Sequence, residues 1–130
     1  MKKLSIISLL TLFVFVACKK DKEEAPPTLK GKWQVENSVY KEFVNNALTN
    51  TLTEPGAGAT MDFQDNGHVI IKHSDNTVES LTYSISTDSK VNIDGDVFDI
   101  KNLTTSAATL FLRYTWAPGE YDEVTINLKR

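Results

Sequence analysis

The stretch MDFQDNGHVII, residues 61–71, contains two short segments in which apolar and polar residues alternate. Met61 and Phe63 occupy alternate positions before a Gln-Asp-Asn-Gly sequence, and Val69 and Ile71 occupy alternate positions after it, so each pair has the same parity in the numbering. Alternation with a period of two puts the apolar residues on one face of a strand, and Asn-Gly is favoured in tight hairpin turns. The stretch therefore predicts an antiparallel hairpin with one buried face.

The same alternation continues in both directions along the chain and brings the number of such segments to eight. The apolar residues that share a parity in the other six are Trp33, Val35 and Val39; Leu81, Tyr83 and Ile85; Val91 and Ile93; Phe98 and Ile100; Leu110, Leu112, Tyr114 and Trp116; and Val124, Ile126 and Leu128. After residue 17, no stretch shows a sustained stripe with the 3.6-residue period of a helix. We therefore expect an all-β domain.

Most connections between these segments are short, which favours antiparallel neighbours over parallel crossovers. Eight strands joined by hairpins either stay open with two exposed edges or close into an up-and-down barrel that removes the edges. A Greek-key sandwich is the alternative, and it needs a long connection between its sheets. Residues 44–59 are the only long connection, so we predict a closed eight-stranded antiparallel β-barrel with this segment as a loop between the first two strands.

The N-terminus has the three zones of a secretory signal: basic residues at 2 and 3, an apolar stretch over 4–17, and a small residue, Ala17, before the single cysteine. Fourteen helical residues would span about 21 Å, too short for a hydrocarbon core of about 30 Å. We therefore predict a cleaved signal peptide over 1–17. Cys18 cannot form an internal disulfide because the chain has one cysteine.

Phe15-Val16-Ala17-Cys18 resembles the lipobox of bacterial lipoproteins. The resemblance implies that Cys18 becomes the first mature residue and carries diacylglyceryl and N-acyl lipid, with no other cofactor. Residues 18–30 are charged and proline-containing, which predicts a flexible, lipidated tether. The charged run after Cys18 is similar to the export signal of lipoproteins of the Bacteroidota, and a solvated spacer is the other interpretation. We expect a cell-envelope protein anchored in the outer membrane, on either its periplasmic or its surface face.

Gly31-Lys32-Trp33 opens the first strand as the G-x-W motif does in lipocalins, and the order and spacing of the later strands agree. Residues 31–130 thus resemble the lipocalin-like domains of bacterial lipoproteins. In that family the tryptophan packs at the closed end of the barrel under a basic residue of the last strand, a cation-π contact. The resemblance therefore implies a barrel-closing pair of Trp33 with Arg130, or with Lys129.

An eight-stranded barrel is either filled by its own side chains or encloses one small molecule. Large inward-facing residues would therefore either line an apolar ligand pocket or form the core. The candidates are Trp33, Met61, Phe63, Tyr83, Phe98, Tyr114 and Trp116.

Other function classes find no support in the sequence. The net charge is −3 and no basic cluster follows residue 32, which argues against a nucleic-acid partner. His68 and His73 lie five residues apart on one strand, so they would face opposite sides, and we expect no metal site. No catalytic motif is present, and we expect no enzyme activity. Two hypotheses remain: a membrane-anchored module that binds a small apolar ligand in its barrel, or a packed barrel that docks on, or inhibits, another envelope protein.

Overall fold

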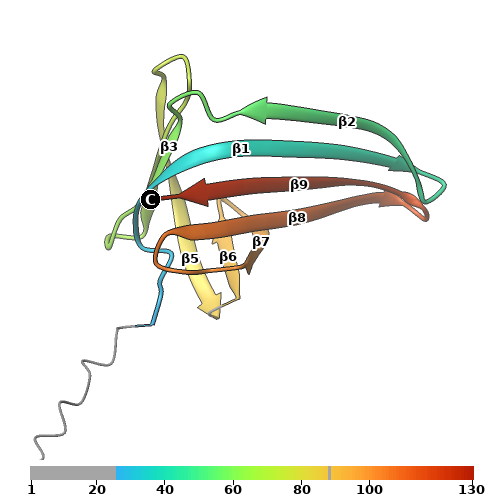
Figure 1. Cartoon of the computed structure of the whole chain (residues 1–130). Coiled ribbons are helices and arrows are strands. Elements are labelled where there is room, and N and C mark those ends of the chain that lie inside the picture. The colour runs from blue at the N-terminus through green and yellow to red at the C-terminus, as the bar shows by residue number, and fades with distance from the viewer. Residues whose placement is uncertain (1–25, 88) are drawn as a thin grey trace, which may run out of the picture.

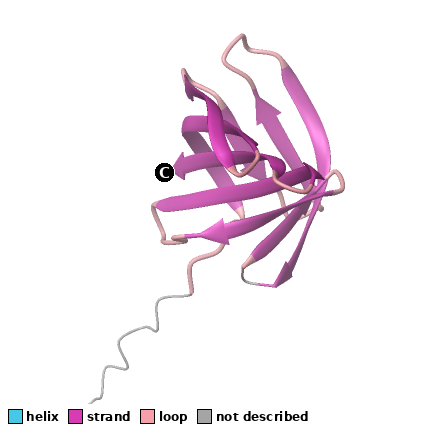
Figure 2. Ribbon diagram, turned by 90° about the vertical axis from the view of Figure 1, so that its right-hand side faces the viewer, coloured by secondary structure: helices cyan, strands magenta, loops and turns pink. Residues whose placement is uncertain are grey.

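A computed structural model describes residues 26–87 and 89–130, and all regular structure in them is β-strand (Figure 2). The strands are β1 (Gly31–Val44), β2 (Ala47–Pro55), β3 (Thr60–Phe63), β4 (His68–Lys72), β5 (Val78–Thr87), β6 (Lys90–Ile93), β7 (Asp96–Lys101), β8 (Ala107–Ala117) and β9 (Glu120–Lys129). In these residues, no helix has the length and apolar character needed to cross a membrane.

Eight of the strands close into an antiparallel up-and-down barrel, which confirms the predicted fold class. Each strand from β3 to β8 pairs with the next strand in the chain, and β1 closes the ring by pairing with both β3 and β9. The predicted hairpin is present, with Met61 opposite Ile71 and Phe63 opposite Val69. Closure satisfies the backbone groups that two free sheet edges would expose.

The segment predicted as a long loop is instead a ninth strand, so that prediction was wrong. Asn45 and Asn46 both have positive φ, 52° and 61°, and form a two-residue turn that folds β2 back against β1. Asparagine tolerates this conformation better than most residues, and a turn with two positive φ values fits the twist of a hairpin. Only residues 56–59 remain as a connection to β3.

A β-bulge at Glu36 changes which residues of β1 face inward. Val35 pairs with Leu128, but the next pair is Asn37 with Asn127, so one residue of β1 is extra. The insertion reverses the parity of the rest of the strand. Val39, which we expected on the same face as Trp33, therefore faces outward, and Ser38 and Tyr40 face inward beside Ile126 and Val124.

Four long strands extend beyond the rest of the barrel. β2, β1, β9 and β8 lie side by side in that order and project past the shorter hairpins of β3 to β7 (Figure 1). We call the projecting part the extension; it comprises residues 37–55 and 112–125. β7 pairs with β8 only as far as Phe111, so the part of β8 in the extension pairs with β9 alone among the described strands.

The core lies at the other end of the barrel. Its buried apolar side chains come from the loop before β1 and from every barrel strand except β5, and they are Leu29, Trp33, Met61, Phe63, Val69, Val91, Ile93, Phe98, Ile100, Ala108, Leu110 and Leu128. Leu29 is only 1% exposed, so the folded unit begins before Gly31, where we had placed the boundary with the tether.

Candidate functional site

Trp33 and Arg130 meet at the closed end of the barrel. The Arg130 guanidinium carbon lies 3.9 Å from the centre of the Trp33 ring, which is fully buried. The same guanidinium donates hydrogen bonds to the carbonyls of Thr28, Lys30 and Thr105. The Trp33 indole N–H donates to the Leu29 carbonyl at 2.7 Å. These contacts join the first and last residues of the barrel and seal that end.

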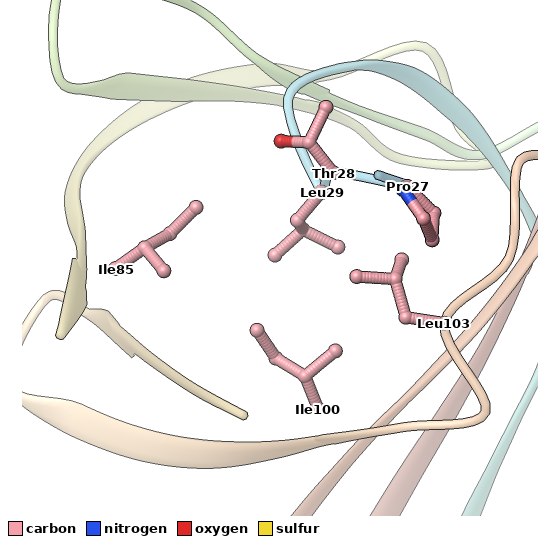
Figure 3. A pocket seen from close by; sticks show the side chains of 6 residues that line it. All are labelled: Pro27, Thr28, Leu29, Ile85, Ile100 and Leu103. Carbon is pink, nitrogen blue, oxygen red and sulfur yellow. The ribbon is translucent and has the colours of Figure 1, made fainter. Parts of the chain in front are cut away.

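The segment before β1 completes this seal. Leu29 points toward Ile100 and Leu103, with Ile85 on the opposite side (Figure 3). The space left between these side chains is a pocket of about 60 Å³, whose other lining residues are Pro27 and Thr28. A volume this small is well below that of a typical ligand site, so the closed end is a packed core with a minor gap.

The opposite end of the barrel opens into a larger pocket, which we call the mouth. It has a volume of about 300 Å³, at the lower end of the range for small-molecule sites. Its apolar lining comes from Val35, Met61, Ile71 and Ile126, with Pro55 at the end of β2 and Gly56 and Ala59 in the loop that follows. Its polar lining is Ser38, Glu54, His73 and Ser74. The mouth therefore combines an apolar floor with a few polar groups at its rim.

A second pocket continues from the mouth along the extension. It has a volume of about 130 Å³ and is lined by Ser38, Val39, Tyr40, Leu52, Glu54 and Val124. Ser38 and Glu54 line both pockets, so the two form one trough along the inner faces of β1, β2 and β9. Glu54 pairs with Ser38 across the strands, and Leu52 pairs with Tyr40.

Asp122 organises the aromatic residues farther along the inner face. It is the one buried charged residue of the described chain, at 9% exposure, and it accepts a hydrogen bond from the Trp116 indole at 3.0 Å. A hydrogen bond to Asp122, with smaller effects of burial and of the charges of Asp122 and Glu42, raises the pKa of the Tyr40 phenol. Tyr40 thus lies close to Asp122, beside the second pocket.

The predicted lining residues separate into three groups. Trp33, Met61, Phe63 and Phe98 are buried in the core, and only Met61 also reaches the mouth. Tyr83 is half-buried, packs edge-on against Phe63, and donates its hydroxyl proton to the Gln64 carbonyl; burial raises the pKa of this phenol.

Tyr114 and Trp116 are in neither the core nor the closed part of the barrel. They are 51% and 66% exposed, because β8 continues past the end of β7 and carries them onto the extension. Their rings lie 5.3 Å apart. The expectation that they fill or line the barrel interior is therefore wrong.

Sequence reasoning missed the polar half of the trough. Val39 was placed on the face of Trp33 because nothing in the sequence marked the bulge at Glu36, which left Ser38 and Tyr40 out of the predicted interior, and Glu54 lay in the segment taken for a loop. The one available signal was the pair Asn45-Asn46 followed by a threonine-rich run, which is typical of a turn and a strand.

Cys18, the signal peptide over 1–17 and most of the tether lie outside the described residues. Within 26–87 and 89–130, no three His, Cys, Asp or Glu side chains gather as a metal site. His73 lies at the mouth, 3.2 Å from Glu79.

No protein-family model matches the chain, and no curated protein is significantly similar to it.

Proposed function

We propose that this protein is a lipid-anchored envelope protein whose barrel mouth binds a small apolar molecule. The observation that carries the proposal is the asymmetry of the barrel interior: one end is filled and sealed, and the other opens into a pocket of about 300 Å³ with an apolar floor. Burial of an apolar ligand on that floor would contribute about 25 cal/mol per Å² of apolar surface removed from water. The anchor rests on the lipobox resemblance at Cys18.

The test is photolabelling of the full chain in nanodiscs of neutral lipid with a twelve-carbon alcohol that carries a diazirine. We expect saturable labelling of peptides that contain Ile71 or Ile126. Ile71→Trp should fill the mouth and reduce labelling at least about fivefold, since a pocket at the lower end of the usual range has no spare volume. Val78→Trp is the matched control, because Val78 is 63% exposed and pairs with Lys72 on the outer face. Labelling that does not saturate, or that Ile71→Trp leaves unchanged, would contradict the proposal.

A docking protein is the second candidate, and the extension favours it. Within the described residues, β2 pairs with β1 alone, so its other edge is free to pair with an added strand. Leu48 and Leu52 on β2 are both more than half exposed. A photocrosslinking residue at Thr51 should then capture an envelope protein in intact cells, whereas the same residue at Asp65, at the closed end, should not. Equal capture at both positions would remove this candidate.

A further inference from the structure

The inner and outer faces of the strands differ in charge. Every lysine and arginine within the nine described strands has the parity of the outer face, opposite to that of the core residues; these are Lys32, Lys41, Lys72, Lys90, Lys101, Arg113 and Lys129. Glu42, Glu54, Glu79 and Asp122 have inner parity. The trough and its surroundings therefore carry negative charge, and the cationic group that lines the mouth is His73, when protonated.

Glu54 lies where the apolar mouth joins the second pocket. It lines both, and in the described residues no ion pair of its carboxylate is present, whereas Glu79 is paired with His73. Glu54 is exposed to solvent, and its attraction for a cation increases where a bound ligand removes the pair from water and so lowers the local dielectric constant. Glu54 is thus placed to contact the charged end of a ligand whose apolar part occupies the mouth.

The second pocket has the chemistry of a partial aromatic cage. Tyr40 supplies an aromatic ring, and Leu52 and Val124 supply apolar walls. Aromatic faces bind organic cations through the cation-π interaction, which contributes most where the cation is partly removed from water. Glu54 completes the cage with a negative charge.

We infer that the ligand is an amphipathic organic cation, with its apolar chain in the mouth and its positive head group between Tyr40 and Glu54. The inference rests on the proposed function, since it assigns the ligand class of the same pocket. An anionic amphiphile such as a fatty acid would place its carboxylate against Glu54, and the like charges would repel.

The test uses three diazirine probes that share a twelve-carbon chain and differ in head group: trimethylammonium, alcohol and carboxylate. Each is titrated against the full chain in nanodiscs of neutral lipid, and site-specific labelling at the trough is quantified. We expect half-saturation by the trimethylammonium probe at a concentration about tenfold below that of the carboxylate probe, the order expected for one charge contact that the bound ligand partly shields from water.

Two variants separate the head-group contacts from the chain contacts. Glu54→Gln should weaken labelling by the trimethylammonium probe about fivefold to tenfold and leave labelling by the alcohol probe unchanged, because the substitution removes only the charge. Tyr40→Leu should also weaken the cation selectively, since it keeps apolar volume and removes the ring. Asp65→Asn, which makes the same charge change at the closed end, should alter none of the three.

The two proposals fail in different ways. If no probe labels the trough, the proposed function fails. The ligand class is overturned, and the apolar site stands, if the alcohol probe labels the mouth but the carboxylate probe binds as tightly as the trimethylammonium probe. The same conclusion follows if Glu54→Gln leaves labelling by the trimethylammonium probe unchanged.

Discussion

The two ends of this barrel are built by the same strands and have opposite properties. At the closed end, β1 and β9 bring Trp33 and Leu128 into a core where each is at most 2% exposed. At the other end the same two strands carry Tyr40, Val124 and Asp122 on the inner face of the extension, where β7 no longer pairs with β8. The difference arises because β8 and β9, with β1 and β2 beside them, continue past the point where β7 stops pairing with β8. The closed end therefore provides stability, and the open end provides a surface that is free for binding.

The largest effect is expected when the two tryptophans, one at each end, are substituted in turn. Trp33→Ala removes a fully buried ring together with its hydrogen bond and its contact with Arg130, and should lower the free energy of unfolding by about 3–5 kcal/mol. Trp116→Ala removes a ring that is 66% exposed and should cost less than about 1 kcal/mol. Chemical denaturation of both variants measures the two values. Similar losses would mean that the extension contributes to the core.

Arg130 offers a smaller test of the seal. Arg130→Met keeps the aliphatic packing but removes the cation-π contact and three hydrogen bonds to carbonyls, so we expect a loss of about 1–3 kcal/mol. Hydrogen exchange should show increased opening at Leu29 and Trp33 and little change at Tyr40. Uniform opening along β1 would argue against a locally sealed end.

The smallest effect is expected for a surface ion pair. The Lys90 ammonium lies 2.7 Å from an Asp99 carboxylate oxygen, and its hydrogen bond lowers the pKa of that carboxyl below the ordinary value of 3.8. A lowered folded-state pKa contributes stability above the unfolded pKa, and that contribution is lost as the pH falls through the folded value.

Lys90→Met should therefore raise the Asp99 pKa, measured by NMR titration, and reduce stability at pH 7 by less than about 0.5 kcal/mol, because both side chains are about half exposed. A large loss of stability at pH 7 would mean that this surface ion pair, and not the buried core, makes a major contribution to the free energy of unfolding.

The barrel was predictable because β3 to β9 each bury one face, β5 only partly through Leu81 and Tyr83, and burial of one face leaves a period of two in the sequence. β2 was not predictable in this way, since its residues are exposed on both faces and leave no apolar period; Ala47–Pro55 is exposed throughout. The contact between Trp33 and Arg130 was expected from a family resemblance, not from spacing.

The trough was not predictable because it depends on a single inserted residue. Parity counted from Trp33 places Val39 inside and Tyr40 outside, and the bulge at Glu36 reverses both. Bulges carry little sequence signal, and a shift of one residue exchanges the faces of everything after it. The fold could therefore be predicted from the alternation of apolar and polar residues within each strand. The candidate site could not, because it depends on the bulge that interrupts this alternation in β1.

The isoleucine methyl groups report on both ends of the barrel and test the central claim most directly. Ile71 and Ile126 line the mouth, and Ile85 and Ile100 line the gap at the closed end. Methyl NMR spectra of the full chain in nanodiscs would be recorded during titration with a twelve-carbon alcohol. We predict saturable shifts for Ile71 and Ile126 with Ile85 and Ile100 unchanged. Shifts at Ile85 and Ile100, or no saturable shift at the mouth, would contradict the assignment of the open end as the binding site.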